Sequence, residues 1–441
     1  MTGWLEASRV YLDRRIVAMI FLGFASGLPF GVLADPLTAW LAEAGVTKTS
    51  IGLFAWLSIP FGIKFVWAPL IDHVPLPVLS RALGRRRGWV ILTQILLVVA
   101  IFGLGQTDPA IYLWRTALFS LIVAFLAASQ DIALDAYRIE ILAEDQLAAG
   151  SANWTFGWRI AQVGGAALGL IFADIFPWTA VFTGLAAFIG VGIIAILINP
   201  EPARPPGEST PAATVGGAWI SYAFVAPFIE FIVGRRGWLA ILLLILLYKF
   251  GDAVLTQMKI PFFLEIGFSK TDIALYSKGI GWVTTVFFTL LGGLFAVRVG
   301  LVRAMFLAGI LMALTNLMFS VLAWSGKSEL MFAFAVVMDD LAGAFATVTF
   351  VAFISMLVDR TYTATQYALL ASIGTAGRTL FASGSGALVD WLNGDWGVFF
   401  VITAVMVLPS LLCLWLIRHQ LARMLVGSHV RLFSKEAHQD P

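Results

Sequence analysis

The chain has 441 residues, of which 60% are hydrophobic and 12% are charged. Soluble globular domains average about 25% charged residues, so this composition excludes a soluble domain and indicates a polytopic membrane protein. The formal net charge of +2 gives no reason to expect a nucleic-acid partner. The single cysteine, Cys413, excludes an intramolecular disulfide and the two-thiol metal motifs.

Apolar runs long enough to cross a bilayer recur twelve times along the chain. They fall near residues 16–41, 50–71, 89–106, 112–136, 152–174, 178–198, 238–262, 273–296, 301–324, 329–357, 363–388 and 396–418. The proline-rich stretch 199–237 separates the sixth run from the seventh and indicates a linker. Its apolar part, 218–233, is too short to span, and we expect it to lie on the membrane surface as a helix.

We therefore predict an all-α polytopic membrane protein with twelve transmembrane helices in two six-helix halves. The predicted domains are an N-terminal six-helix bundle (1–198), a cytoplasmic linker with a surface helix (199–237), a C-terminal six-helix bundle (238–418) and a cytoplasmic tail (419–441).

The distribution of Lys and Arg among the loops predicts the orientation. With a cytoplasmic N-terminus, the inner side holds 18 of these residues, in the N-terminal segment, loop 72–88, the linker, the tail and the even-numbered loops. The outer side holds four: Lys48, Arg115, Lys270 and Lys327. Both termini are therefore expected in the cytoplasm.

Each half carries a loop that combines glycine with arginine after its second helix. In the first half, Asp72 is followed by Gly84-Arg-Arg-Arg-Gly88; in the second, Gly292-Gly293 precede Arg298 and Arg303. Two parallel six-helix halves with a binding site near the midplane are the architecture of the major facilitator superfamily. We expect a conformational latch at the inner helix ends, formed by Asp72, Arg85, Arg86, Arg87, Arg298 and Arg303. The alternative is that these arginines only fix topology.

Several motifs in both halves carry a more specific resemblance. They are Leu22-Gly-Phe-Ala-Ser-Gly-Leu-Pro29, Lys64-Phe-Val-Trp-Ala-Pro-Leu-Ile-Asp72, Gly84-Arg-Arg-Arg-Gly-Trp89, Ala128-Ser-Gln-Asp-Ile-Ala-Leu-Asp-Ala136, Leu247-Tyr-Lys-Phe-Gly-Asp252 and Thr365-Gln-Tyr-Ala-Leu-Leu-Ala-Ser372. This combination resembles the AmpG-type muropeptide permeases. The resemblance implies import of anhydromuropeptides, the sugar-peptide fragments of cell-wall turnover, across the bacterial inner membrane, driven by protons.

Carboxylates inside apolar runs are costly and by default mark an ion or substrate path. Asp131 and Asp135 are four residues apart and share one helix face. We expect proton coupling from Asp131, Asp135, Asp252 and one of the adjacent pair Asp339 and Asp340, which are therefore candidate proton-coupling residues. The alternative is that these acids only pair with basic groups and hold helices together; Lys64 is expected either to snorkel or to pair with Asp135.

A substrate with sugar hydroxyls and peptide carboxylates calls for cations, amides and aromatic faces. Lys249 and Asp252 are three residues apart in the seventh helix and are expected to pair, which leaves a self-neutralised structural pair as the alternative. The candidate substrate-binding residues are Gln130, Arg159, Tyr248, Lys249, Gln257 and Arg378.

An enzyme is the competing class, and the sequence gives it little support. All four histidines lie in loops or the tail, and there is neither a Gly-x-Ser-x-Gly elbow nor a Walker-type loop. We expect no cofactor and no metal, and a monomer in the lipid bilayer. Import of a ferric siderophore or another mid-sized polar solute, or a membrane assembly factor without a transport cycle, stay open as alternatives.

Overall fold

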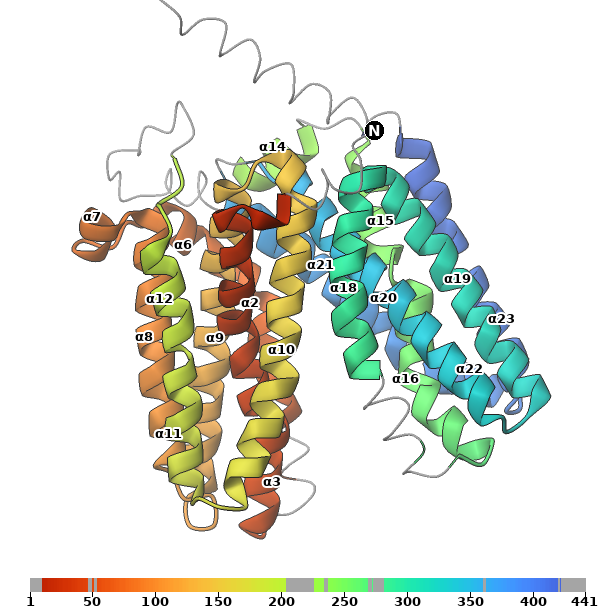
Figure 1. Ribbon diagram of the computed structural model, residues 1–441, viewed down its shortest axis with the longest axis horizontal. Coiled ribbons are helices and arrows are strands. Elements are labelled where there is room, and N and C mark those ends of the chain that lie inside the picture. Colours follow the sequence, from red (N-terminus) through yellow and green to blue (C-terminus); the bar gives the residue numbers. More distant parts are fainter. Residues whose placement is uncertain are drawn as a thin grey trace, which may run out of the picture. The chain divides into compact units, whose positions relative to one another are not determined.

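The computed structural model describes residues 10–46, 50, 54–203, 226–233, 237–268, 272, 281–359, 362–418 and 421. Within these ranges the chain is built of helices and contains no β-strand (Figure 1). Nine of the described helices are long and apolar enough to cross a membrane. The predicted all-α membrane fold is confirmed, whereas the total of twelve spans stays a prediction. Most of the linker and of the tail lies outside the described residues.

The chain divides into two compact units. The first comprises Met1–Phe231, Thr289–Arg298 and Ile354–Ser372, and the second comprises Ile232–Phe288, Val299–Phe353 and Ile373–Pro441. The first unit therefore contains the predicted N-terminal half together with two short stretches of the C-terminal half. Those two stretches are parts of helices whose other ends belong to the second unit.

The first unit is a bundle of helices that begins near the N-terminus. Its helices are η1 (Val10–Leu12), α2 (Arg14–Leu33), α3 (Asp35–Glu43), η2 (Phe54–Ser58), α5 (Ile59–Ile63), η3 (Lys64–Val66), α6 (Ala68–His73), α7 (Leu79–Leu83), α8 (Arg85–Gly105), α9 (Leu113–Ile141), η4 (Glu144–Gln146), α10 (Leu147–Ala173), α11 (Trp178–Phe188) and α12 (Gly190–Ile198). The linker helix α14 (Ala226–Val233) follows, and most of it belongs to this unit.

Helices α2 and α10 pack closely because glycine lies on both sides of their contact. A Cβ on Gly23 or Gly27 would come within 2.3 Å of a backbone carbonyl oxygen of α10, and one on Gly157 would meet the Ile20 oxygen at 1.9 Å. Small residues let membrane helices approach at backbone distance. This contact fixes α2 so that Ser26, between the two glycines, lies next to α9.

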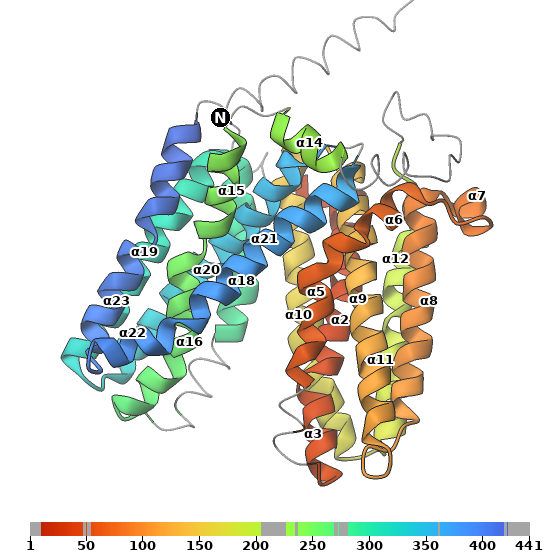
Figure 2. The same cartoon turned by 180° about the vertical axis from the view of Figure 1, so that it is seen from behind.

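The predicted span 50–71 is broken into short pieces. Pro60 and Pro69 lack a backbone N–H and cannot continue an ideal helix, and the chain forms η2, α5, η3 and α6 in succession. The pieces α5 and α6 both pack along α9 (Figure 2). Lys64 begins the short 3₁₀ turn between them, so its side chain is placed beside α9.

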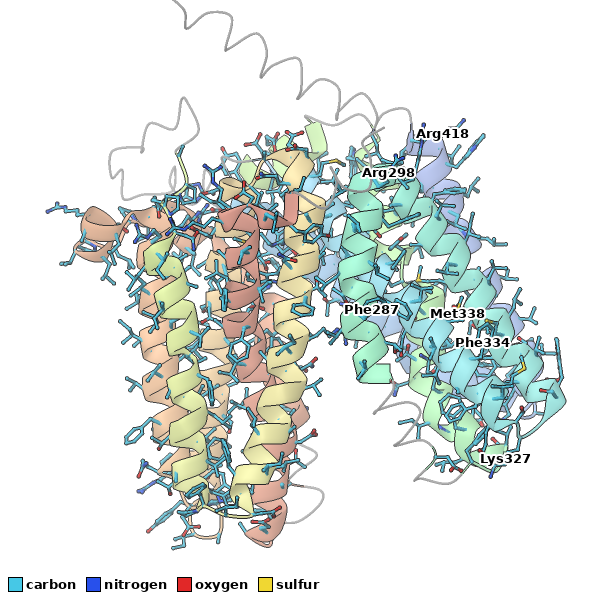
Figure 3. All side chains as sticks on the ribbon, in the orientation of Figure 1. Phe287, Arg298, Lys327, Phe334, Met338 and Arg418 are labelled. Atoms are coloured by element: carbon cyan, nitrogen blue, oxygen red, sulfur yellow. The ribbon has the colours of Figure 1, made fainter. Side chains whose placement is uncertain are left out.

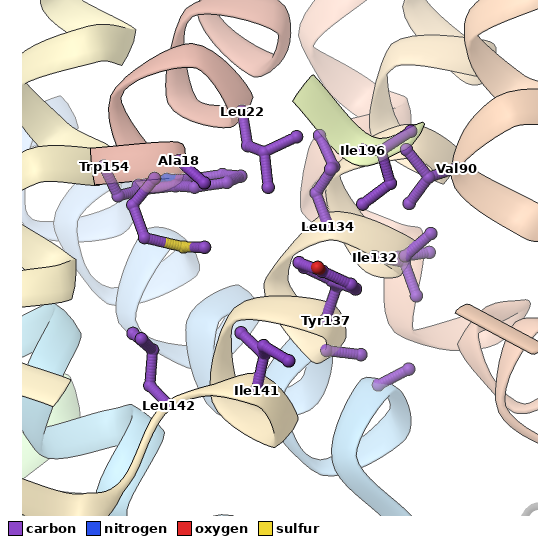
Figure 4. Packing of buried hydrophobic residues seen from close by; sticks show 14 of the residues in the cluster. Ala18, Leu22, Val90, Ile132, Leu134, Tyr137, Ile141, Leu142, Trp154 and Ile196 are labelled. Atoms are coloured by element: carbon purple, nitrogen blue, oxygen red, sulfur yellow. The ribbon is translucent and has the colours of Figure 1, made fainter. Parts of the chain in front are cut away.

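An apolar cluster at one end of the first unit joins its helices. Leu22 of α2, Val90 of α8, Tyr137 of α9 and Ile196 of α12 are all buried in it (Figure 4). Ala364 and Ala368, from the first part of α21, are buried in the same cluster. This packing accounts for the inclusion of residues 354–372 in the first unit.

The second unit is built from the remaining helices. These are α15 (Trp238–Leu247), α16 (Phe250–Glu265), α18 (Gly281–Val299), α19 (Leu301–Ser325), α20 (Glu329–Leu357), α21 (Thr363–Ser383), α22 (Ser385–Trp391) and α23 (Trp396–Val405), with parts of α18, α20 and α21 in the first unit. Its core is aromatic: Phe262, Phe263, Phe319, Phe332 and Phe400 are fully buried. The seventh predicted span breaks between α15 and α16, at Tyr248 and Lys249.

Candidate functional site

Asp131 and Asp135 share a lysine in the first unit. The Lys64 ammonium lies 3.6 Å from a carboxylate oxygen of each acid. Ser26 Oγ donates a hydrogen bond of 2.6 Å to the other oxygen of Asp131. Lys64 is only 7% exposed, so the pair of acids and the cation form a buried charge cluster. Of the two alternatives for Lys64, the structure shows the pairing with Asp135, and Asp131 is a second partner.

Arg138, one turn along α9, extends this cluster. Its guanidinium pairs with Asp135 at 3.2 Å and donates to the hydroxyls of Ser151 at 2.9 Å and Ser355 at 3.1 Å. The same group lies over the ring of Tyr367, 5.3 Å from its centroid. A continuous set of polar contacts therefore runs from Ser26 in α2 to the end of α20. Two acids and two cations balance, as buried charges require.

Asp72 joins α6 to the start of α21. Its carboxylate is buried and accepts hydrogen bonds from the backbone N–H of Ala364 at 3.1 Å and of Thr365 at 2.7 Å, and from the Thr365 hydroxyl at 2.7 Å. An acid at this position also complements the positive end of the α21 dipole. Burial by itself raises the pKa of Asp72, but Arg86, His73 and the hydrogen bonds from Arg86 and Thr365 hold the pKa below its usual value.

Of the four arginines in loop 72–88, the consecutive three, Arg85 to Arg87, have different partners. Arg86 is fully buried and pairs with Asp72 at 2.7 Å and with Glu140 of α9 at 2.5 Å. Arg85 donates to the Asp72 carbonyl at 2.9 Å. Arg87 donates to the Leu197 carbonyl at 3.0 Å. Arg85 and Arg86 therefore converge on Asp72, whereas Arg87 contacts the end of α12 instead.

Both described ends of the linker touch this latch. The Glu201 carboxylate accepts the backbone N–H of Arg86 at 2.8 Å and of Arg87 at 3.0 Å, at the N-terminus of α8. Glu230 of α14 accepts a hydrogen bond of 2.5 Å from Gln366, the residue after Thr365. The linker therefore supplies an acid at α8 and a second acid at α21.

A second set of charged pairs lies in the second unit. Lys249 lies 3.4 Å from Asp252, as expected, and donates to the Thr347 hydroxyl at 2.9 Å. Asp339 pairs with Lys259. Asp340, the next residue, accepts a hydrogen bond of 2.7 Å from the Thr284 hydroxyl. The two adjacent acids thus have different partners, as two residues about 100° apart on a helix must.

A polar cavity of about 510 Å³ lies between α16 and α21, within the second unit. Its lining includes three predicted site residues, Asp252, Gln257 and Arg378. The hydroxyl-bearing residues Thr256, Thr375 and Thr379 line it as well. The volume lies within the range of small-molecule sites, about 300 to 1,000 Å³.

The other predicted residues lie elsewhere. Tyr248 is fully buried, with its hydroxyl donating to the Met305 carbonyl at 2.9 Å and its ring stacked on Phe350, so the structure does not bring it to the cavity. Gln130 is buried and donates to the Ala25 carbonyl at 2.9 Å. Arg159 lies over the ring of Trp158 in α10. Arg298, in the last turn of α18, belongs to the first unit, whereas Arg303, in the first turn of α19, belongs to the second.

Comparison with known proteins identifies the family. A family model described as "Acetyl-coenzyme A transporter 1" matches residues 15–114. The anhydromuropeptide permease of Escherichia coli K12 is 32% identical over 415 residues, which cover 94% of this chain and 82% of that protein. The chain belongs to the AmpG family. A putative AmpG transporter of Rickettsia felis is 30% identical, over 92% of this chain and 97% of that protein.

The fold of this AmpG-family chain is that of the major facilitator superfamily. A solved structure of a proton:xylose symporter of that superfamily aligns with a TM-score of 0.65, at 13% identity, over 93% of this chain and 95% of the other. The predicted fold class and family resemblance are therefore confirmed. The relatives are named as permeases and transporters, so the chain is a multi-pass membrane transporter.

Sequence reasoning missed several residues of these clusters in the AmpG-family chain. Arg138 and Glu140 follow the Asp131 motif directly, and their charge next to an apolar run was the available signal. Thr365 begins the motif that ends at Ser372, but its partner Asp72 is 293 residues away in the sequence. Glu201 and Glu230 lie in a linker that shows no spacing pattern.

Proposed function

We propose that this chain is a proton-coupled importer of anhydromuropeptides across the bacterial inner membrane, working as a monomer by alternating access of its two halves. The cavity between α16 and α21 is the observation that carries the proposal, because it offers a cation, an amide and three hydroxyl groups to one solute. The similarity to the Escherichia coli permease, which covers most of both chains, supports the same substrate class.

The cavity residues match the groups of such a substrate. Arg378 can form two parallel hydrogen bonds with a peptide carboxylate. Gln257 and the three threonines can donate to, and accept from, sugar hydroxyls and peptide groups. Asp252, held by Lys249, leaves this side of the cavity polar without an excess of negative charge.

Transport should depend on these contacts. In proteoliposomes with an imposed pH gradient, we expect uptake of a labelled anhydromuropeptide, and little uptake of a ferric siderophore or of acetyl-coenzyme A. Arg378→Gln should raise KM by about tenfold, because a charge-assisted hydrogen bond is worth roughly 1.5 to 3 kcal/mol. Arg115→Gln, at an exposed arginine stacked on Tyr112, is the matched control and should leave KM unchanged. Preferred uptake of either competing solute would refute the proposed substrate.

The charged clusters of the two units support the proposed proton coupling. In each unit a carboxylate lies within pairing distance of a lysine, at Asp131 with Lys64 and at Asp252 with Lys249. Protonation of such an acid releases the lysine to its other partner, which is Asp135 for Lys64. We assign the coupling role to these acids and the closing of the cytoplasmic side to the Asp72 latch.

The orientation is open to a direct test. Because basic residues are in excess on the expected inner side, we expect α7 in the cytoplasm and loop 106–112 outside. In a variant with Cys413→Ala, cysteines at Ala82 and Ala110, both exposed alanines, serve as matched reporters. In intact cells an impermeant thiol reagent should label Ala110→Cys and spare Ala82→Cys. The reverse labelling pattern would overturn the orientation.

A further inference from the structure

An apolar groove runs between α19 and the chain that continues from α23. Its volume is about 370 Å³, and Val302, Phe306, Leu307, Leu414 and Trp415 are among the side chains that line it. It is separate from the polar cavity, with which it shares no lining residue. The two segments are held together close to the groove: a Cβ on Gly309 would meet Leu411 Cδ2 at 2.6 Å.

Two arginines line this groove, Arg303 from α19 and Arg418 from the end of the second segment. The Arg418 guanidinium lies 4.2 Å from the centroid of the Trp415 ring and donates to the Trp415 carbonyl. Figure 3 shows Arg418 at one end of the second unit, with Lys327 at the other. A Trp next to a cation at the end of a membrane helix is typical of the level of the lipid headgroups.

Within the described residues, no carboxylate balances the charge of this groove. Its lining contains no carboxylate, and in the part of the chain that the structure describes neither Arg303 nor Arg418 has an acidic partner. Arg303 also lies in the first turn of α19, which contains no acid and whose N-cap, Gly300, offers no side-chain hydrogen bond. The positive end of the helix dipole therefore adds to the two guanidinium charges.

We propose that this groove is a binding site for an anionic phospholipid of the adjacent leaflet. One acyl chain lies along the apolar lining, and the phosphate is held by Arg303 and Arg418 near the N-terminus of α19. The apolar lining of the groove suits the acyl chain, because apolar side chains offer no hydrogen bonds to a soluble anion. The two arginines suit the phosphate and favour an anionic headgroup over a zwitterionic one. Basic pockets between membrane helices bind anionic headgroups through this combination.

The test compares lipid binding in wild type and in charge variants. The full chain is placed in nanodiscs of phosphatidylcholine with an increasing fraction of phosphatidylglycerol, and its Tm is recorded; native mass spectrometry counts the retained phosphatidylglycerol. For wild type we expect Tm to rise with the phosphatidylglycerol fraction and at least one lipid to be retained. Each of Arg303→Gln and Arg418→Gln should weaken the apparent affinity by about fivefold, and the double variant by more.

Two further variants separate a defined site from general surface charge. Arg115→Gln removes another exposed, ring-stacked arginine outside the groove and should keep the wild-type response. Val302→Trp should fill the groove and abolish retention while both arginines stay in place. The proposal fails if Arg115→Gln loses as much as the groove variants, if Val302→Trp retains the lipid, or if the Tm of wild type is the same at every phosphatidylglycerol fraction. None of these readouts depends on transport, so they are independent of the proposed substrate.

Discussion

Replacing Asp72 by asparagine should slow uptake by at least tenfold in a protein that still folds and inserts. The asparagine amide would point a donor at Arg86 or at the N–H groups of α21, and it removes the charge that pairs with Arg86 at 2.7 Å. Breaking a buried ion pair costs roughly 3 kcal/mol. A loss of that size confined to the latched state shifts the balance of conformations by about a hundredfold. We therefore expect the latched, outward-open state to become rare.

Two measurements can detect the loss of the latched state in Asp72→Asn. Uptake is compared with that of Asp174→Asn, an exposed acid of the same unit that serves as the control. Opening is followed with a cysteine at Ala368, which is buried in the same cluster as Ala364, in a Cys413→Ala background. In inside-out vesicles Asp72→Asn should speed labelling of Ala368→Cys. Unchanged uptake together with unchanged labelling would remove Asp72 from the latch.

Much of this arrangement could be predicted from local pattern. The four-residue spacing of Asp131 and Asp135 places both acids on one face of any helix, and the structure turns that face to Lys64. The arginine loop 85–87 with Asp72 identified a helix-end cluster without any knowledge of its partner. Residue type and spacing are sufficient where the contact lies within one helix or one loop.

Contacts between distant segments could not be predicted in the same way. Lys64 reaches two acids because Pro60 and Pro69 break its span and α5 and α6 then pack along α9. Thr365 meets Asp72 because the first part of α21 packs in the cluster of the first unit. Asp72 and Thr365 are 293 residues apart in the sequence and meet only because their helices pack together. The spacing of residues within one helix carries no information about such a contact.

Tyr248 shows the same limit within four residues. The sequence predicts Tyr248 and Lys249 as substrate-binding neighbours in one helix, but the break between α15 and α16 lies at this point. The tyrosine faces α19 and bonds the Met305 carbonyl, whereas Asp252 faces the cavity. In an unbroken helix, Tyr248 and Asp252 would be four residues apart on one face and would share neighbours.

Neutralising either central acid should uncouple transport from the proton gradient. Asp131→Asn leaves Lys64 with Asp135 as its carboxylate and so imitates the proton-bound state permanently. Asp252→Asn likewise leaves Lys249 with the Thr347 hydroxyl but without its carboxylate. An amide cannot take up or release a proton, so neither variant can complete a proton cycle. Movement of substrate down its own gradient does not require that cycle.

In proteoliposomes we therefore expect Asp131→Asn and Asp252→Asn to lose accumulation against a gradient and to keep energy-independent exchange of labelled anhydromuropeptide. Asp108→Asn, in a loop where the carboxylate accepts a hydrogen bond from the backbone N–H of Ala110, is the control and should accumulate as wild type does. Loss of exchange as well would indicate misfolding or lost binding, which the Tm of each variant distinguishes. If both variants, at normal expression, still accumulate substrate in response to a pH gradient, the coupling role moves to Asp135 or to the α20 pair, Asp339 and Asp340.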